Sequence, residues 1–264
     1  MLPAPIALTI AGSDSGGGAG LQADLQTFGT LGVHGTTAVT CLTAQNPRGV
    51  TGVRAATPEF VRRQIETVLA ELHPAACKTG MLYSTGIIRA VAGCLRSVRR
   101  IPLIVDPVMV ATSGAVLLKP GAIRALCDEL LPLAELITPN LDEAELLLSR
   151  RIRDEEELRQ AARELVRRFG CAALVKGGHL RGTRDAVDIF NDGRTELLLA
   201  APFVRSVSTH GTGCTYSAAI AAGRARGESL PKAVERAKNF ITAAIAGSKP
   251  IGKHFVLNWR DAGL

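Results

Sequence analysis

The chain has 264 residues and a formal net charge of +7, because 31 Lys and Arg residues outnumber 24 Asp and Glu residues. Hydrophobic residues make up 47% and charged residues 21%, which excludes a disordered or fibrous chain. The positive balance leaves three anionic partners to separate: nucleic acid, a membrane surface and a small phosphorylated ligand.

Much of the positive charge lies in residues 150–168, where Arg and Glu alternate at helical spacing, as in Glu155/Arg159 and Glu164/Arg168. Such pairs stabilise a solvated helix face by about 0.2–0.5 kcal/mol each and require no partner. No basic run is interleaved with aromatic residues, so a surface that stacks nucleic-acid bases is not expected. No stretch approaches the roughly 18 apolar residues of a membrane span.

The 6 cysteines form no CxxC pair, and the 5 histidines form no HExxH motif. We therefore expect neither a structural zinc site nor a disulfide framework. With no secretory signal pattern visible, a reducing cytoplasm is the expected location.

Short apolar runs alternate with longer helical patterns along the first two thirds of the chain. The runs predict strands at Ile6–Ala11, Thr36–Thr43, Ala75–Lys78, Pro102–Asp106, Leu136–Thr138 and Ala172–Lys176. Helical periodicity is found near residues 19–31, 58–72, 84–97, 120–130, 140–148 and 154–169. Continuous apolar strands that alternate with helices predict right-handed crossovers and a parallel sheet with helices on both faces.

The order of elements changes after Lys176. Val187–Phe190 and Thr195–Ala200 flank Asn191-Asp192-Gly193, which predicts a hairpin and hence an antiparallel edge. Two helices, near residues 213–226 and 231–247, close the chain. Because no linker or internal repeat is visible, residues 1–264 are predicted to form one α/β domain.

Polar and glycine-rich clusters follow most of the predicted strands. They are Gly12–Gly20, Gln45-Asn46, Lys78-Thr79-Gly80-Met81, Asp106, Thr138–Glu143 and Lys176-Gly177-Gly178, and Thr209–Cys214 opens the first closing helix. The carboxyl ends of parallel strands meet at one edge of a sheet, where ligands bind. These distant segments are therefore predicted to converge on one site.

The segment Thr209–Cys214 carries the sharpest signal. Gly211 and Gly213 precede an alanine-rich helix, whose first backbone amides would form a preorganised anion hole. Cys214 lies in the first turn, where the helix dipole should favour its thiolate and allow it to act as a base. The alternative is a small buried cysteine under an ordinary glycine turn.

The glycine-rich stretch of residues 11–32 predicts a close backbone approach to a ligand. Residues 18–23 also fit the loose Gly-x-Gly-x-x-Gly/Ala pattern of dinucleotide binders. That pattern requires an acidic residue about 20 positions later, and none occurs between Asp24 and Glu59. No Gly-x-x-x-x-Gly-Lys-Ser/Thr sequence is present, so a P-loop is excluded as a motif.

Four further residues, at strand ends or in the helix turn that follows, favour a nucleotide and a metal. Asn140 suits a helix entry, and Glu143 in the following first turn complements the helix dipole. With Asp106, this carboxylate is a candidate for holding Mg²⁺, directly or through waters. Lys176 supplies a compact positive charge for phosphate.

Taken together, these segments resemble the ribokinase-like superfamily, and most closely its hydroxymethylpyrimidine/phosphomethylpyrimidine kinase family of thiamine biosynthesis. The resemblance is carried by AGSDSGGGAGLQADLQTF, TAQNPRGV, KTGML, VDPVMVATSG, LITPNLDEAELL, LVKGGHL and STHGTGCTYSAAIAA. It implies a three-layer αβα sandwich with a mostly parallel central sheet and an antiparallel edge. It also implies ATP as co-substrate, Mg²⁺, a homodimer, and two successive phosphate transfers to 4-amino-5-hydroxymethyl-2-methylpyrimidine.

The resemblance also assigns roles to residues. Cys214 would be the base, and the amides of Gly211, Thr212, Gly213 and Cys214 would form the anion hole. Asn140, Glu143 and Lys176 would lie along the ATP phosphates and Mg²⁺, with Asp106 nearby as a second metal ligand. Gln45 would hydrogen-bond the pyrimidine edge, and the pocket would be lined by Gly12, Asp24, Met81 and Val108.

The sequence departs from the family pattern at Gly16, at Thr112 and in the tail at residues 255–259. Most ribokinase relatives carry Asp where Cys214 stands, whereas a cysteine is similar to the pyrimidine kinases and some pyridoxal kinases. A pyridoxal kinase on the same fold therefore stays open as an alternative. So do an NAD(P)-dependent oxidoreductase that uses residues 18–23 and a non-enzymatic sensor that binds the pyrimidine or a nucleic acid.

Overall fold

The computed structural model describes residues 4–98, 100–109, 118, 121–178, 180, 185–204 and 210–262. Thr112 and Thr209 lie outside the described residues. In the described part of the chain, no helix is long and apolar enough to cross a membrane.

The described residues form one large central sheet, whose strands have the order β3-β2-β1-β4-β5-β6-β7-β8-β9. The strands are β1 (Ile6–Asp14), β2 (His34–Asn46), β3 (Gly49–Ala55), β4 (Ala76–Thr79), β5 (Leu103–Val105), β6 (Leu136–Ile137), β7 (Ala172–Lys176), β8 (Asp185–Asn191) and β9 (Glu196–Pro202). β2, β1, β4, β5, β6 and β7 are parallel. β3 is antiparallel at one edge, and β8 and β9 are antiparallel at the other. The predicted mostly parallel sheet with an antiparallel edge is confirmed.

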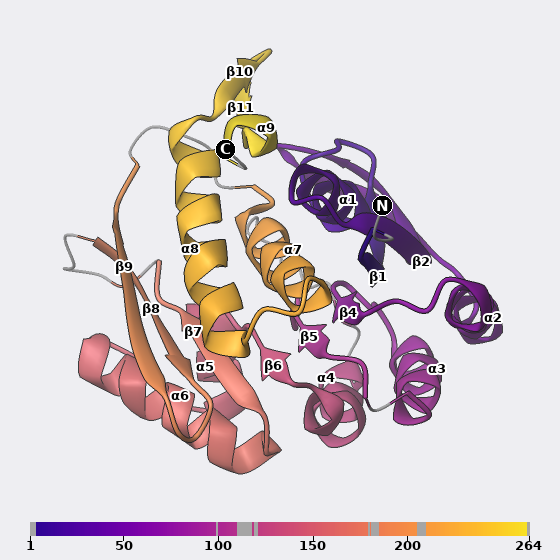
Figure 1. Cartoon of the computed structure of the whole chain (residues 1–264), viewed down its shortest axis with the longest axis horizontal. Helices are drawn as coiled ribbons and strands as arrows, with labels where there is room; N and C mark the ends of the chain where they lie inside the picture. Colours follow the sequence, from indigo (N-terminus) through magenta and orange to yellow (C-terminus); the bar gives the residue numbers. More distant parts are fainter. Residues whose placement is uncertain are drawn as a thin grey trace.

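Helices cover both faces of this sheet (Figure 1). They are α1 (Gly20–Thr30), α2 (Pro58–Glu71), α3 (Thr85–Arg96), α4 (Ala122–Ala125), α5 (Leu141–Leu148), α6 (Glu155–Phe169), α7 (Thr212–Ala225), α8 (Leu230–Ala246) and α9 (Trp259–Ala262). One core cluster joins the sheet to α2 through α6, and the other joins it to α1, α7, α8 and α9. Two helical layers around one sheet confirm the three-layer sandwich.

Helix α7 is buried on nearly every side, because it lies between the sheet and α8 (Figure 1). Its residues are mostly small, and a Cβ on Gly223 would lie only 2.9 Å from the Cβ of Ala233 in α8. This close packing fixes the axis of α7, whose first turn reaches the carboxyl edge of the sheet. The sequence Thr212–Cys214 is thereby held on a rigid element.

Some predicted elements differ from the structure. The helix expected near residues 120–130 is the short α4 followed by a π-helical turn at Leu126–Leu130. The strand β3 was not predicted, and neither was the hairpin of β10 (Lys249–Ile251) and β11 (His254–Val256). Both are largely exposed, so they lack the apolar runs that revealed the buried strands.

The divergent tail packs against α7. Trp259 is buried, and its Nε1 donates a hydrogen bond to Thr215 Oγ1 at 3.0 Å. The amide of Asn258 donates to the Ala244 carbonyl of α8 at 3.1 Å. The tail therefore supports the helix that carries the candidate catalytic residue.

Candidate active site

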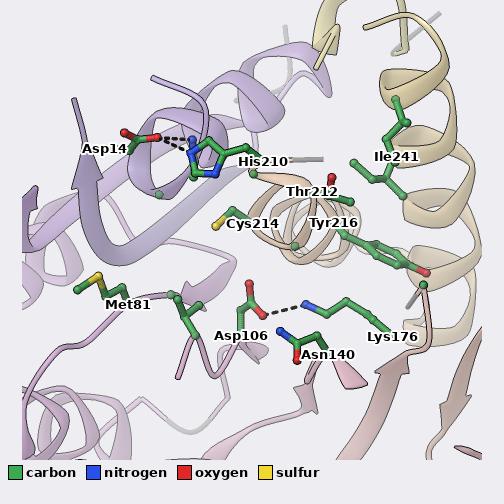
Figure 2. Close-up of a pocket in the computed structure, with 18 of the residues that line it drawn as sticks. Asp14, Met81, Asp106, Asn140, Lys176, His210, Thr212, Cys214, Tyr216 and Ile241 are labelled. Atoms are coloured by element: carbon green, nitrogen blue, oxygen red, sulfur yellow. Dashed lines mark hydrogen bonds and ion pairs between the residues drawn. The ribbon is translucent and has the colours of Figure 1, made fainter. Parts of the chain in front are cut away.

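A cavity of about 580 Å³ lies at the carboxyl ends of the parallel strands. Its walls come from the ends of β1, β2, β4, β5 and β7, from the first turns of α5 and α7, and from α8. Figure 2 shows Cys214 between two groups of side chains: Asp14, His210 and Met81 on one side, and Asn140, Lys176 and Tyr216 on the other. Segments far apart in sequence thus converge as predicted.

Most of the predicted site residues line this cavity. They are Gly12, Gln45, Met81, Asp106, Val108, Asn140, Glu143, Lys176, Gly211, Thr212, Gly213 and Cys214. The exception is Asp24, whose side chain is fully buried beneath the cavity and does not line it. Its carboxylate contacts Lys78 at 2.9 Å and Thr9 at 2.6 Å, so the placement of Asp24 in the pocket wall was wrong.

The first turn of α7 begins at Gly211, where any side chain would force the backbone to move. Gly211 has φ +83°, in the left-handed region, and a Cβ there would lie 1.8 Å from the Gly18 carbonyl oxygen. The N-cap has no side chain to cover the helix end. Because an α-helix leaves its first amides without intrahelical acceptors, this end is suited to bind an anion.

The surroundings of Cys214 favour the thiol over the thiolate. Burial raises its pKa to about 11, and the carboxylates of Asp24 and Asp106 act in the same direction. Lys78 and the amide of Gly20 oppose them and lower the pKa. Desolvation of the charged sulfur thus opposes the thiolate that the helix dipole is expected to favour.

Asp106 links the sheet to α7 through three contacts. Its Oδ1 accepts from Lys176 Nζ at 3.1 Å and from Thr138 Oγ1 at 3.2 Å, and its Oδ2 accepts from Ser217 Oγ at 3.3 Å. A Cβ on Gly213 would lie 3.2 Å from Lys176 Nζ, so the first turn of α7 packs directly on this ion pair. Although burial opposes it, Asp106 helps to raise the pKa of Lys176, which stays charged.

Asn140 and Glu143 form a capping box at the start of α5. Asn140 Oδ1 accepts from the Glu143 amide and Glu143 Oε2 accepts from the Asn140 amide, both at 2.9 Å. Glu143 Oε1 accepts from the Met109 amide at 3.0 Å, beside Val108, whose φ of +44° is rare for a β-branched residue. Burial raises the pKa of Glu143 to about 7.

Asp14 and His210 were not predicted as site residues. Asp14 accepts hydrogen bonds from the amides of Gly16, Gly18 and Ala19 at 2.8–3.2 Å. The His210 ring contacts the Asp14 carboxylate at 3.1 Å, which ties the glycine-rich loop to the start of α7 (Figure 2). Burial opposes this pairing, but the bond to His210 keeps the pKa of Asp14 low. An aspartate that precedes a glycine run often binds its own backbone in this way, and that signal was available.

The far wall of the cavity holds a second ion pair. Lys238 in α8 donates to Asp188 Oδ2 at 2.7 Å and to the Ala186 carbonyl at 2.9 Å. Tyr216 and Ile241 form the adjoining surface (Figure 2). These residues gave no sequence signal because they lie within ordinary strand and helix patterns.

Comparison with known proteins decides the family. The family model for phosphomethylpyrimidine kinase matches residues 14–258 of the chain. The chain belongs to this family. It is therefore a kinase, that is, a phosphotransferase, and its resemblance to this family is confirmed.

Two relatives show the extent of the similarity. The chain is 49% identical to the hydroxymethylpyrimidine/phosphomethylpyrimidine kinase of Rhizobium meliloti, over 97% of this chain and 99% of that protein. It is also 49% identical to the thiamine biosynthesis bifunctional protein of Geobacter sulfurreducens, over 93% of this chain. The match spans only 50% of the length of that bifunctional protein.

Solved structures agree with the fold. The phosphomethylpyrimidine kinase of Clostridium difficile superposes with a TM-score of 0.81 at 39% identity, covering 91% of this chain and 99% of that one. The pyridoxal kinase of Bacillus subtilis, solved as an ADP complex, superposes with a TM-score of 0.88 at 36% identity, covering 97% of each chain.

Proposed function

We propose that this kinase transfers the terminal phosphate of ATP to the hydroxymethyl group of hydroxymethylpyrimidine, and then phosphorylates the monophosphate, in thiamine biosynthesis. The names of the Rhizobium meliloti and Bacillus subtilis relatives, 49% and 43% identical, support this substrate. The NAD(P) oxidoreductase alternative has no support, because the glycine-rich stretch belongs to a kinase family and lacks the acidic residue for the ribose.

The observation that carries the proposal is the position of Cys214. It lies in the first turn of α7, between a pocket with Gly12, Gln45 and Met81 and a polar wall with Lys176. A pyrimidine alcohol in the first pocket and a nucleotide along the second wall would place the reacting oxygen and phosphorus beside Cys214. The Gln45 amide, which can both donate and accept, suits the edge of a pyrimidine.

The chemistry follows from this arrangement. As a thiolate, Cys214 accepts the proton of the substrate hydroxyl, and that oxygen forms a bond to the terminal phosphorus. The bond between this phosphorus and the bridging oxygen of ADP breaks, and ADP leaves. The amides at the start of α7 stabilise the negative charge on the transferring group, and Lys176 stabilises charge on the phosphates.

Mg²⁺ fits the residues present if the nucleotide supplies most of its ligands. Among the described residues, no three His, Cys, Asp or Glu side chains gather to hold a metal. Mg²⁺ at kinase sites is usually bound by one or two carboxylates together with phosphates and waters. Asp106 and Glu143 are the candidate carboxylates. The oxygens of both already accept hydrogen bonds, Glu143 from two backbone amides and Asp106 from side chains, so we propose that both hold the ion through waters. When bound, the ion would neutralise charge on the phosphates.

Product analysis with the pyrimidine alcohol and ATP tests this proposal. We expect the monophosphate first and the diphosphate second, each accompanied by ADP. Detection of only the monophosphate would reject the second transfer, and no ADP release with any pyrimidine alcohol would favour a sensor.

Pyridoxal kinase is the second candidate, because the Bacillus subtilis pyridoxal kinase superposes with a higher TM-score than the Clostridium difficile enzyme. Sequence identity favours the pyrimidine, since the pyrimidine kinase of Rhizobium meliloti is 49% identical and this pyridoxal kinase 36%. Values of kcat/KM for the two alcohols, measured side by side, separate the candidates. A large preference for pyridoxal would overturn our choice.

We also propose that two copies of the chain form a homodimer. The edge strand β3 is exposed on both faces, and Leu42 on the neighbouring β2 has 57% of its surface exposed. A second copy would cover this edge and its unpaired backbone groups. Light scattering on the purified kinase should give twice the mass of the chain.

A cytoplasmic location is our last proposal in this section. All 6 cysteines are free thiols, as is usual in a reducing compartment. Cell fractionation tests it.

A further inference from the structure

A buried ion pair beneath the cavity has no role in the chemistry described so far. Lys78 Nζ lies 2.9 Å from each carboxylate oxygen of Asp24, and both side chains are completely buried. Thr9 donates a third hydrogen bond to Asp24 at 2.6 Å. Neither Lys78 nor Asp24 lines the cavity, so they do not contact a ligand there.

Sheet register places Lys78 directly under the site. Lys78 pairs with Thr9 of β1 and with Ile104 of β5, on the sheet face that α1 and α7 cover. Two residues further along the same face are Gly80 and Asp106, which line the cavity. A Cβ on Gly80 would lie 3.1 Å from Lys78 Nζ, so the ammonium extends upward to the level of the cavity floor.

The charges that face Cys214 come from four elements or their ends. Lys78 on β4 and Lys176 on β7 are positive, whereas Asp24 on α1 and Asp106 after β5 are negative. Of these, Lys78 is the strongest influence that favours the charged sulfur. The effect is mutual, because the Cys214 thiolate in turn helps to raise the pKa of Lys78.

We propose that Lys78, held in place by Asp24, is a positioning residue for the phosphate transfer: it keeps a fixed positive charge behind Cys214 and so stabilises the thiolate that accepts the substrate proton. This inference rests on the proposed role of Cys214 as the base. Lys78 acts through the sulfur and not on the substrate.

The partner carboxylate explains why the charge stays in place. A lone buried ammonium would lose its proton or turn toward solvent, because leaving a buried charge unpaired is costly. With Asp24 and Thr9 engaged below it, Lys78 does not reach into the cavity to bind phosphate. The absence of a side chain on Gly80 leaves the space that the ammonium needs.

The test measures the ionisation of Cys214 in the ligand-free kinase, without any turnover. The rate of alkylation by iodoacetamide is followed against pH, with mass spectrometry of the peptide that contains Cys214. The double variant Lys78→Met/Asp24→Asn removes both charges and leaves no unpaired ion. Lys238→Met/Asp188→Asn is the matched control, because it removes another buried Lys–Asp pair, which is not among the main influences on the pKa of Cys214.

We expect alkylation of Cys214 below pH 9 to fall about three- to tenfold in the Lys78 variant, because Lys78 lowers the pKa of Cys214 more than Asp24 raises it. Each pKa unit changes the thiolate fraction about tenfold. The control should stay within about twofold of wild type. An unchanged rate in the Lys78 variant, or an equal fall in both, would overturn the inference. If the first variant does not fold, Lys78→Gln/Asp24→Asn replaces it, with two amides that can hydrogen-bond to each other.

The same alkylation data keep this inference apart from the proposed function. If Cys214 is not the base, Cys214→Ala keeps its kinase activity, but the pair still controls the ionisation of the thiol. If only the present inference fails, Cys214→Ala loses activity and the alkylation rates of wild type and double variant coincide.

Discussion

Cys214 must lose its proton before it can accept one from the substrate, and burial opposes that loss. The replacement Cys214→Ala removes the base but leaves the amides of Gly211–Cys214 and the nucleotide wall unchanged. We expect kcat to fall by about 10²–10⁴, while ATP binding stays within about threefold. A fall of less than about tenfold in kcat would assign the catalysis to the anion hole instead. Single-turnover kinetics and ATP titration measure the two effects.

The raised pKa of Cys214 predicts a pH dependence. Below a pKa of about 11, the thiolate fraction increases about tenfold with each pH unit, so kcat/KM for the alcohol should rise from pH 7 to pH 9. The variant Cys214→Asp, whose carboxylate ionises at much lower pH, should show no such rise. A flat profile in the wild-type kinase would contradict a thiolate base.

A substitution at Gly211 should lower kcat by displacing the backbone at the start of α7. Both Gly211 and Gly227 have φ near +80°, but only at Gly211 would a Cβ meet backbone atoms, at 1.8 Å from the Gly18 oxygen. Gly211→Ala should therefore displace the first turn of α7 and lower kcat by at least about 10², as does removal of an anion-hole donor. Gly227→Ala, with open space around it, should lower stability by about 1 kcal/mol and leave kcat unchanged. Equal kcat values for the two variants would contradict this reading.

Single residues at the site could be predicted where local chemistry was sufficient. Gly211, Cys214, Asn140 and Lys176 have strand-end or helix-start positions that sequence spacing makes visible. Asp24 could not be placed correctly, because its burial depends on Lys78, which is 54 positions away. Tertiary contacts of this kind leave no local pattern.

At the scale of elements, buried strands were more predictable than exposed ones. β7 begins and ends at the predicted residues, because it is apolar and covered on both faces. β3 has a polar, glycine-containing sequence and is exposed, so its strand conformation depends on pairing with β2. The packing of the tail on α7 could not be predicted from the sequence either. It depends on a hydrogen bond from Trp259 to Thr215, which are 44 positions apart.

The connection between the tail and α7 can be measured. Trp259→Phe keeps an aromatic ring but removes the donor to Thr215, so the free energy of unfolding should fall by about 0.5–1.5 kcal/mol. Thr215→Val removes the acceptor, and the double variant should reveal a coupling energy of about 1 kcal/mol. Additive losses in urea denaturation would show that the two side chains do not interact.

At the scale of the whole molecule, most of the charge lies away from the cavity. Arg159 and Arg163 both pair with Glu196, and Arg224 pairs with Glu135, so much of the basic excess is engaged in ion pairs between elements. In the proposed site, backbone amides and Lys176 would recognise the phosphates. The glycines that shape these amides are thus more informative about function than the net charge.

This distribution of charge predicts that the KM for ATP depends only weakly on salt concentration. Raising KCl from about 50 to 200 mM should increase the KM for ATP by less than about fivefold, because few of the described residues that line the cavity are Lys or Arg: Arg48, Lys176 and Lys238. A protein that binds DNA through six to ten phosphate contacts would lose about 10³–10⁵ in affinity over the same range. A loss of that size here would indicate a basic surface that takes part in binding.

Trp259 is the single tryptophan of the chain, and it is hydrogen-bonded to the residue that follows Cys214. When Trp259 is excited selectively, its emission reports on its surroundings beside the first turn of α7. Ligand binding, loss of the first turn of α7 and unfolding of the tail would each change its intensity or wavelength. The chain therefore carries its own optical probe of the active site, and the binding experiments above need no added label.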